Sequence, residues 1–396
     1  MSEPIRKRGK VDFPSLLLRA TVVTHLLLIP PYAELARRLG LSRPWLLGTA
    51  LAVLLMLPIQ GKIRTILWDE PRAPWKISLV DEPYFIHWCA TFFGAPFLLV
   101  GYALSAFLDG VQGRLPEPPG PCALGFYLAM VTVGAYAIKI RRRWVTRRRF
   151  EVTMEGLDPA FDGFRIVHLS DLHIGGLLPA GLAERWIHMA NEESPDLTVI
   201  TGDLVTSGVN FHDQIAAVLG RLQAQEGTVV SLGNHDYFGE PEALPLKLQE
   251  AGLRVLRNAS VLIERGGAKL RLAAVDDTWT ARADLEKALA GPKPAPTVLL
   301  AHDPNLFDRA ADLGADLVLS GHTHAGQLAM PFLVERINLA RIAYRYTYGF
   351  YRRGRSTLYV HAGLGTTGPP ARLGAAPEIV TFILRSSPAH SDSNGT

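Results

Sequence analysis

Long apolar runs fill the first 150 residues of the chain, whereas short apolar runs alternate with amphipathic stretches in the remainder. The apolar segments of the first part are Ser15–Tyr32, Trp45–Ile59, Trp88–Phe107 and Cys122–Ile140. A helix needs about 20 apolar residues to cross a bilayer core, and all but the second segment come close to that length. The pattern predicts an all-α transmembrane bundle of about four helices over residues 15–140, after a basic segment at residues 1–14.

Two other interpretations of this region fit less well. A bundle of buried soluble helices would show amphipathic stretches between the apolar runs, and none separates them. A cleavable signal peptide would end after one apolar run, whereas this pattern repeats. An integral, multi-pass membrane protein is therefore expected.

Lysine and arginine in the short loops predict the orientation, because cytoplasmic loops carry an excess of both. With four spans, fourteen such residues fall on one side and four on the other. This places both termini and the C-terminal domain in the cytoplasm. A change of one span would move the domain to the other side. The string ARRLGLSRPWLL, Ala36–Leu47, also loosely resembles a twin-arginine export signal, so the exported side is the alternative.

The run RRRWVTRRR, Arg141–Arg149, directly follows the last apolar segment. A nucleic-acid patch is one interpretation of so many arginines. Next to a span, an anchor on anionic lipid is favoured, since each such residue contributes about 1 kcal/mol there. We expect residues 141–163 to form a basic linker and entry segment, membrane lipids to be partners, and no nucleic acid to bind.

From Glu151 onward the pattern is that of an α/β domain. The tail, residues 386–396, is polar and is predicted to be disordered. Strands are expected at Phe164–Ser170, Leu197–Thr201, Gly227–Gly233, Val261–Arg265, Leu270–Val275, Thr297–His302 and Leu317–His322. Helices are expected near Ala180–Asn191, Asp213–Leu222 and Ala243–Ala251, with another from Pro304.

Most of these strands end in residues that can bind metals. The motifs are D-x-H, GD, GNHD, a single histidine and GHTH, in that order. Ligands at the carboxyl ends of strands share one edge of a sheet, where α/β folds build their sites. Neither of the two cysteines, Cys89 and Cys122, lies near these motifs, so a thiolate site is not expected. The candidates are Asp171, His173, Asp203, Asn234, His235, Asp236, His302, His322 and His324.

On these motifs, with GHTHAGQ and the downstream GLGTTGPPARLGAAPEI, the region from about Phe164 to Leu384 resembles the calcineurin-like metallophosphoesterases. It is most similar to the branch often fused to N-terminal membrane spans. The resemblance implies a four-layer α/β/β/α sandwich over residues 164–385, with two metals at the sheet edge. It implies a first metal held by Asp171, His173, Asp203 and His324, and a second held by Asp203, Asn234, His302 and His322.

The chemistry of these residues agrees with the implied arrangement. Two divalent ions about 3.5–4 Å apart are well served by a shared carboxylate, for which Asp203 is the candidate. Imidazole, carboxylate and amide donors suit Mn, Fe or Zn. The resemblance also implies attack by a metal-bridging hydroxide, with His235 as the acid and an acidic partner. Asp236 is either that partner or a helix cap, and Arg372 either holds a substrate phosphate or forms a structural salt bridge.

The expected function is that of a membrane-anchored hydrolase acting on a phosphate ester or pyrophosphate. The short link to the membrane and the resemblance favour a lipid-linked, UDP-diacylglucosamine-like substrate. A phosphodiesterase or phosphatase acting on soluble nucleotides is the alternative within enzymes. A membrane scaffold with an inactive phosphoesterase domain is the alternative from another class, and the complete ligand set argues against it.

Overall fold

The computed structural model describes residues 13–67, 70–114, 120–291 and 295–386. It divides into two compact units, of which the first holds the chain up to Ile138 apart from residues 68–72, and the second holds that segment and everything from Lys139 onward. Most of the predicted basic N-terminal segment and nearly all of the predicted tail lie outside the described residues. Ser386, counted with the tail, ends the last strand.

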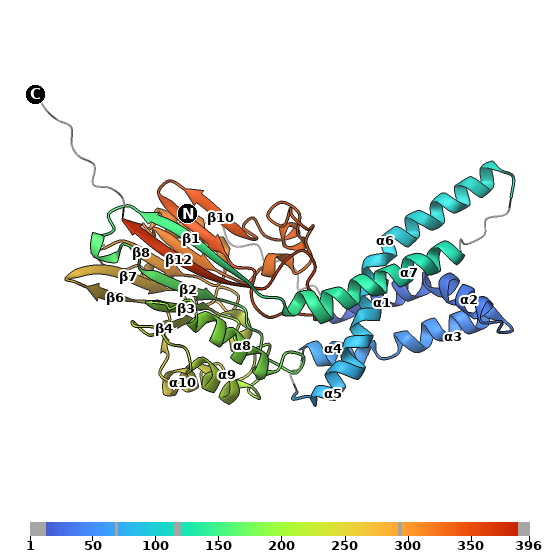
Figure 1. Ribbon diagram of the computed structural model, residues 1–396, viewed down its shortest axis with the longest axis horizontal. Helices are drawn as coiled ribbons and strands as arrows, with labels where there is room; N and C mark the ends of the chain where they lie inside the picture. The colour runs from blue at the N-terminus through green and yellow to red at the C-terminus, as the bar shows by residue number, and fades with distance from the viewer. Residues whose placement is uncertain (1–12, 68–69, 115–119, 292–294, 387–396) are drawn as a thin grey trace, which may run out of the picture. The chain divides into compact units, whose positions relative to one another are not determined.

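The described part of the first unit is helical (Figure 1). Three of its helical stretches are long and apolar enough to cross a membrane, namely Pro44–Ile66, Pro74–Val111 and Gly120–Arg143. Its helices are α1 (Phe13–Leu26), α2 (Ile29–Arg38), α3 (Pro44–Met56), α4 (Ile59–Leu67), α5 (Pro74–Lys76), α6 (Glu82–Val111) and α7 (Gly120–Ala135), with the π-helical turn η1 (Ile77–Asp81). After α7 the chain passes into the second unit through the π-helical turn η2 (Tyr136–Ile140) and the 3₁₀ turn η3 (Arg141–Arg143).

The number of spanning helices differs from the predicted four because the first apolar segment is broken. The chain turns between α1 and α2, and Pro30 and Pro31 lie in the first turn of α2. Proline has no N–H to donate and clashes with the preceding turn, so a helix does not continue through such a pair. The second segment, predicted to be short, instead runs on through α4.

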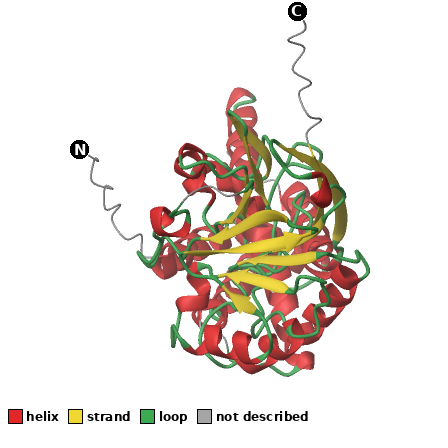
Figure 2. Ribbon diagram, turned by 90° about the vertical axis from the view of Figure 1, so that its left-hand side faces the viewer, coloured by secondary structure: helices red, strands yellow, loops and turns green. Residues whose placement is uncertain are grey.

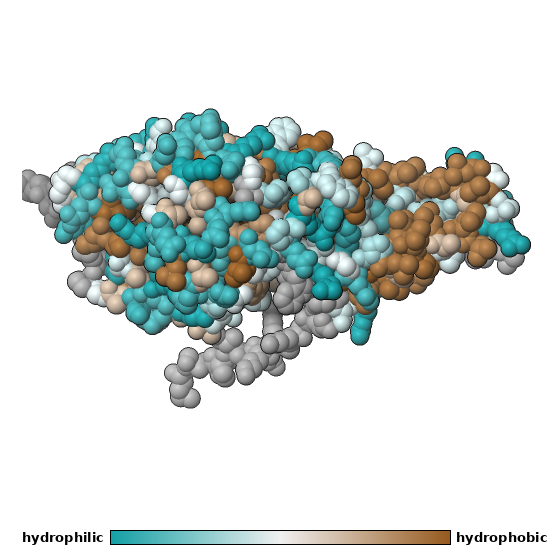
Figure 3. Space-filling model, turned by 90° about the horizontal axis from the view of Figure 1, so that it is seen from below, coloured by the Kyte–Doolittle hydropathy of each residue, from teal (hydrophilic) through white to brown (hydrophobic). Residues whose placement is uncertain are grey.

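Apolar side chains cover much of the outer surface of the spanning helices (Figure 3). Leu54, Phe97 and Phe107 are each more than 60% exposed. The interior instead holds hydrogen-bonded polar groups. The His25 ring donates from Nδ1 to the Thr21 carbonyl at 2.8 Å, and Trp88 donates to the Thr21 hydroxyl at 2.9 Å. Apolar groups outside and satisfied polar groups inside are typical of helices packed in lipid.

The second unit contains two six-stranded sheets, and Figure 2 shows their strands at the centre of the view. Strand order is β1-β12-β2-β3-β4-β5 in one sheet and β10-β11-β9-β8-β7-β6 in the other. The strands are β1 (Thr146–Met154), β2 (Arg165–Leu169), β3 (Leu197–Thr201), β4 (Thr228–Ser231), β5 (Arg254–Val255), β6 (Ala259–Arg265), β7 (Ala268–Ala274), β8 (Thr297–Leu300), β9 (Leu317–Ser320), β10 (Gly349–Arg353), β11 (Ser356–Val360) and β12 (Glu378–Ser386).

Helices cover the outer face of each sheet. The first sheet packs on α8 (Ala180–Asn191), α9 (His212–Leu219) and α10 (Ala243–Glu250), which lie beneath β2–β4 in Figure 1. The second packs on α11 (Leu285–Ala288) and α12 (Phe307–Asp312). Short 3₁₀ turns complete the unit: η4 (Pro159–Phe161), η5 (Asn234–Tyr237), η6 (Pro304–Leu306), η7 (His324–Gly326) and η8 (Leu339–Ile342).

Strand alternation explains why both faces of the central strands are apolar. Successive side chains of a strand point to opposite faces. In β2, Ile166 packs between the two sheets and Val167 packs against the outer helices. In β8, Leu300 packs between the sheets and Leu299 packs on the helix side. The predicted four-layer α/β/β/α sandwich is confirmed.

The basic linker and entry segment predicted at residues 141–163 is not a linker over residues 146–154, because Thr146–Met154 form the edge strand β1. This strand pairs in parallel with β12 along nine residues. Arg148 Nε lies 2.9 Å from the buried Glu378 carboxylate, and Arg149 Nε lies 2.7 Å from that of Glu193. The second half of the arginine run therefore holds the edge of the sheet.

Replacing Phe382 tests the inter-sheet core. Phe382 is fully buried between the sheets and contacts the rings of Phe150 and Tyr359. Phe382→Ala is expected to lower the free energy of unfolding by about 3–5 kcal/mol, through lost apolar burial and the cavity left behind. Urea unfolding of the full-length protein in detergent, followed by near-UV circular dichroism, measures the loss. Phe350→Ala is the control, since Phe350 touches the same rings but is 42% exposed. Equal losses in the two variants would contradict this account of the core.

Candidate metal centre

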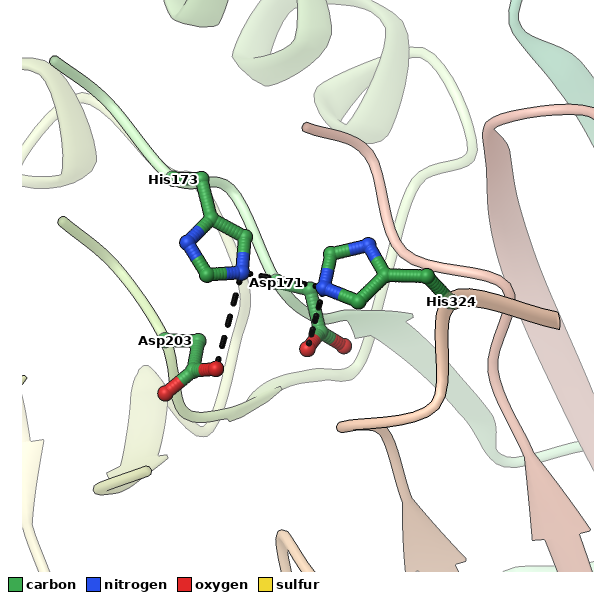
Figure 4. A group of neighbouring side chains, drawn as sticks. All are labelled: Asp171, His173, Asp203 and His324. Atoms are coloured by element: carbon green, nitrogen blue, oxygen red, sulfur yellow. Dashed lines mark hydrogen bonds and ion pairs between the residues drawn. The ribbon is translucent and has the colours of Figure 1, made fainter. Parts of the chain in front are cut away.

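The loops that follow β2, β3 and β9 bring four predicted ligands together (Figure 4). Asp171, His173, Asp203 and His324 each offer one ligand atom, and these atoms all lie within 4.8 Å of one another. His173 Nε2 is 3.0 Å from His324 Nε2 and 3.5 Å from Asp203 Oδ2. His324 Nε2 is 3.3 Å from Asp171 Oδ1. All four residues are buried.

A second group shares one carboxylate with the first. Asp203, His302 and His322 also offer ligand atoms within 4.8 Å of one another. His302 Nε2 lies 3.3 Å from Asp203 Oδ2 and 3.1 Å from His322 Nδ1. Asp203 belongs to both groups, and the loop that follows β9 supplies one histidine to each, His324 to the first and His322 to the second. A shared carboxylate is the arrangement that two adjacent divalent ions require.

The backbone at these positions is unusual. Five of the predicted ligands have positive φ angles, a conformation that non-glycine residues seldom adopt. The values are 52° for Asp171, 47° for His173, 54° for Asp203, 71° for His322 and 53° for His324. Each such residue costs about 1–3 kcal/mol unless its surroundings enforce it, and such strain concentrates at functional sites. Here the turn at Thr323 directs His324 to the first group and His322 to the second.

Asn234 lies beside the second group on η5. Its Oδ1 is buried and has no hydrogen-bond partner in the described part of the chain. Its neighbours contact Asp203 closely: the His235 amide donates to Asp203 Oδ1 at 2.9 Å, and a Cβ on Gly233 would collide with that oxygen and with the His302 ring. A buried amide oxygen without a donor is costly, and coordination to a cation would satisfy it.

Hydrogen bonds behind the ligands orient them. The His302 ring donates from Nδ1 to the Thr201 carbonyl at 2.7 Å, which leaves Nε2 facing Asp203. Ser170 donates to Asp171 Oδ2 at 2.6 Å. His322 Nε2 lies 2.8 Å from the Tyr344 hydroxyl, so Nδ1 is the nitrogen that faces the group. Partners of this kind fix tautomers and ring orientation in metal sites.

The electrostatics indicate that the site requires added positive charge. Burial, with a contribution from Asp203, raises the pKa of Asp171 to about 6 and that of Asp236 to about 7. Burial would lower the pKa of His302, but Asp203 reverses the effect and raises it to about 10. Burial would raise the pKa of Asp203, but His302 and His235 hold it well below its usual value. Without a metal, a proton on His302 balances Asp203.

A divalent cation would supply this positive charge in place of the proton, and it would interact with several carboxylates at once. The nitrogen and oxygen donors, the shared carboxylate and the unpartnered Asn234 oxygen all fit this role. The residues present therefore fit two divalent ions, and their donor set is of the type that Mn, Fe or Zn accepts.

His235 and Asp236, the two predicted catalytic residues, lie close to the ligands, but they do not form the expected pair of a histidine and its acidic partner. His235 donates from Nδ1 to the Thr206 carbonyl at 2.6 Å, and its ring centroid is 4.7 Å from that of His173. Among the described residues, this carbonyl and not an acidic side chain is the partner of His235 Nδ1. Asp236 instead accepts from the amides of Asp203 and Gly233, each at 2.9 Å, and from that of Leu204 at 2.7 Å. These are the contacts of a residue that joins two ligand loops, so a chemical role for Asp236 stays a prediction.

Arg372 is fully buried and contacts the ligand loops. It donates from Nε to the Gly365 carbonyl at 3.0 Å, and its Nη2 is 3.3 Å from His324 Nδ1. In the described part of the chain its hydrogen-bond partners are a carbonyl and an imidazole, and the carboxylates of Asp171 and Glu378 also act on it electrostatically, so the structural salt bridge stays a prediction too. Burial lowers the pKa of its guanidinium to about 10. Binding of a substrate phosphate stays a prediction.

Some residues of the site carry no signal in the sequence. Tyr344 follows no motif, and only the fold brings it to His322. Ser170 precedes the D-x-H motif and contacts Asp171 through its side chain. Gly321 could have been singled out from GHTH, since a Cβ there would collide with Ser170 and Asp171.

Comparisons with known proteins agree with this geometry. Residues 164–326 match the family model of the calcineurin-like phosphoesterase. An uncharacterized metallophosphoesterase of Bacillus subtilis, YkuE, is 35% identical over 286 residues, which cover 71% of this chain and 97% of that protein. A bovine transmembrane protein with a metallophosphoesterase domain is 36% identical over 256 residues, covering 60% of this chain and 56% of that protein.

Among solved structures, an archaeal phosphodiesterase aligns over 50% of this chain and 84% of its own, with 16% identity and a TM-score of 0.30. The assignment of this chain to a family rests on the sequence matches, above all on the near-complete coverage of the Bacillus protein. The chain belongs to the metallophosphoesterase family.

Proposed function

We propose that this protein is a membrane-anchored, metal-dependent phosphoesterase that hydrolyses a phosphate ester or pyrophosphate. The observation that carries the proposal is the pair of donor groups joined by Asp203. Two bound divalent cations would polarise the phosphoryl oxygens and acidify a water molecule. The complete set of donors, five of them held in a strained backbone conformation, is not what a decayed, purely structural domain would retain.

His235 is positioned to handle a proton. Its Nδ1–H is fixed by the Thr206 carbonyl, so Nε2 is the nitrogen that can gain or lose a proton. The ring is partly buried and stacks edge-on against the ligand His173. Protonated at Nε2, it would donate to the oxygen of the leaving group as the bond to phosphorus breaks. Asp236 maintains the geometry by holding the amides of the Asp203 and Asn234 loops.

We further propose that the substrate is lipid-linked, with membrane lipids as partners and manganese, iron or zinc as the metal. The candidate spans support this, since the catalytic domain begins at Thr146, three residues after the last of them ends. A soluble nucleotide is the second candidate, supported by Trp279. Its ring is 64% exposed and lies 5.5 Å from that of His322, where it could stack on a base.

The side of the membrane follows in this proposal from the charges beside the last candidate span. Lys139 and Arg141–Arg143 flank its C-terminal end, and basic residues close to a span favour the cytoplasm. We therefore propose a cytoplasmic catalytic domain.

Asp203→Asn tests the shared carboxylate. The substitution removes the charge that serves both donor groups, so the purified protein is expected to lose bound metal at both positions. Turnover of bis-p-nitrophenyl phosphate should be abolished, because the pair of metals that would polarise the phosphoryl group and acidify the water is no longer held together. Inductively coupled plasma mass spectrometry measures the metal. The control is Asp308→Asn, because Asp308 pairs with Arg345 and Arg353 away from the site. Two metals and unchanged turnover in Asp203→Asn would refute the role of this carboxylate.

His235→Asn tests the proton donor. Metal content is expected to stay the same, while kcat falls about 10²–10⁴-fold for a substrate with a poor, alkoxide leaving group. A p-nitrophenyl ester should be affected much less, because its leaving group needs little protonation. The control is His188→Asn, a surface histidine on α8 whose side chain is 75% exposed. An equal loss on both substrates would assign His235 a role other than protonating the leaving group.

A further inference from the structure

Exposed apolar side chains gather in one loop beside the metal centre. The loop Met330–Ala343 connects η7, which begins at the ligand His324, with the segment that leads to β10. Phe332 is fully exposed and Ile342 is 86% exposed. Scattered exposed apolar residues are ordinary, whereas a contiguous group marks a contact surface. The group consists of Met330, Phe332, Leu333, Ile337, Leu339 and Ile342.

The loop has an ordered framework that keeps these side chains outside. The Met330 amide donates to the Ile337 carbonyl at 2.9 Å, and the Leu339 amide donates to the Leu328 carbonyl at 3.1 Å. The buried Asn338 donates from its side chain to the Val334 carbonyl at 2.7 Å. Because the backbone bonds to itself, the apolar side chains are displayed by a folded element. Phe332 has a φ of 66°, a strained conformation at the tip of this element.

Basic residues accompany the apolar ones. Arg336 and Arg341 are exposed within the loop, and Glu335 is its one acidic residue. Apolar side chains interleaved with arginine are typical of elements that lie in the interface of an anionic bilayer. Each basic residue near such a surface contributes about 1 kcal/mol.

The position of the loop points to the same partner. Tyr344 directly follows it and contacts the ligand His322, so the loop adjoins the metal centre. The strand register shows which end of β1 lies near the metal centre. Arg148 of β1 pairs with Val380 of β12, and Val380 pairs with His168 of β2. The start of β1 therefore lies at the sheet edge where β2 ends and the ligand loop of Asp171 begins.

The last candidate span ends at Arg143, and β1 begins at Thr146. Three residue steps of extended chain reach no more than about 11 Å. The edge that carries the metal ligands is thus also the edge joined to the span. Trp144, between the two, is 63% exposed, and tryptophan is enriched at membrane interfaces.

We propose that Met330–Ala343 is a membrane-contact loop, which inserts Phe332, Ile342 and their apolar neighbours into the headgroup region of the bilayer. The contact holds the metal centre at the membrane surface. The contact itself is independent of catalysis. Its consequence, that the scissile phosphorus lies at headgroup depth, rests on the proposed function.

Site-directed fluorescence tests the contact in the full-length protein. In a background carrying Cys89→Ala and Cys122→Ser, Phe332→Cys or Ile342→Cys is labelled with an environment-sensitive dye and reconstituted into nanodiscs with anionic lipid. Nitroxide groups attached to the upper acyl chain are expected to quench both labels severalfold more than aqueous iodide does. The control is Lys269→Cys, at the start of β7, because this end of the sheet lies opposite the ligand edge. Its label should respond to iodide and not to the lipid nitroxide.

Two results would overturn the proposal. Quenching of the loop labels by iodide alone would show that the loop stays in water. Protection from both quenchers would show that a protein surface, such as a second copy of the chain, covers it. With the label at Ile342→Cys, adding Phe332→Asp should reduce lipid quenching severalfold, whereas Phe332→Leu should preserve it. Hydrolysis of bis-p-nitrophenyl phosphate in the same nanodiscs tests the proposed function separately, since either result can fail alone.

Discussion

The candidate site depends on one buried carboxylate that lies between two groups of imidazoles. Asp203 is almost completely shielded from water, and its side chain lies within 3.5 Å of both His173 and His302. A charge in such a place is costly unless an opposite charge accompanies it. In the metal-free site, a proton on His302 fills this role, and the pKa of that histidine is raised to about 10 as a result. Divalent cations would replace the proton with charges that also serve Asp171 and Asn234.

The sandwich provides the rigidity that this arrangement needs. Five ligands with positive φ would relax if their loops were free to move. They are held because each loop leaves a strand that is apolar on both faces, and because the loops bond to one another. Asp236 joins the loops after β3 and β4, and the His322 amide donates to the Asp171 carboxylate at 3.0 Å. The strain is thus balanced by three packed cores and by bonds between ligand loops.

The sequence predicts those features whose evidence lies in neighbouring residues, and it misses those that depend on contacts between distant ones. The central strands β2, β3, β4, β8 and β9 are apolar on both faces, so short apolar runs identified them together with the ligands that follow. The edge strand β1 was taken for a linker because it begins within the arginine run that follows the last apolar segment. Its pairing with β12 connects residues more than 200 positions apart, and no local pattern records that contact.

The same reasoning explains the other differences. Asp236 reads as an acid beside a histidine, but its amide donors come partly from a distant loop, so its structural role appears only in three dimensions. Tyr344 reaches His322 only through the path of the loop before it. The first apolar segment was expected to span because its length comes close to that of a bilayer helix, although the chain turns after Leu26 and Pro30 and Pro31 begin a new helix. That prediction followed the apolar composition of the segment and did not take into account that its prolines end a continuous helix.

A tethered domain also changes what a membrane-contact loop has to achieve. A free protein must gain its whole membrane affinity from such a loop, whereas here the spans already hold the domain at high effective concentration near the bilayer. The loop then needs only enough binding free energy to select one orientation from many. A few apolar side chains and two exposed arginines suffice for that, and a larger apolar surface would carry an aggregation risk. The small size of the loop is therefore consistent with a role in orienting the metal centre toward the membrane, where the spans alone would leave its direction open.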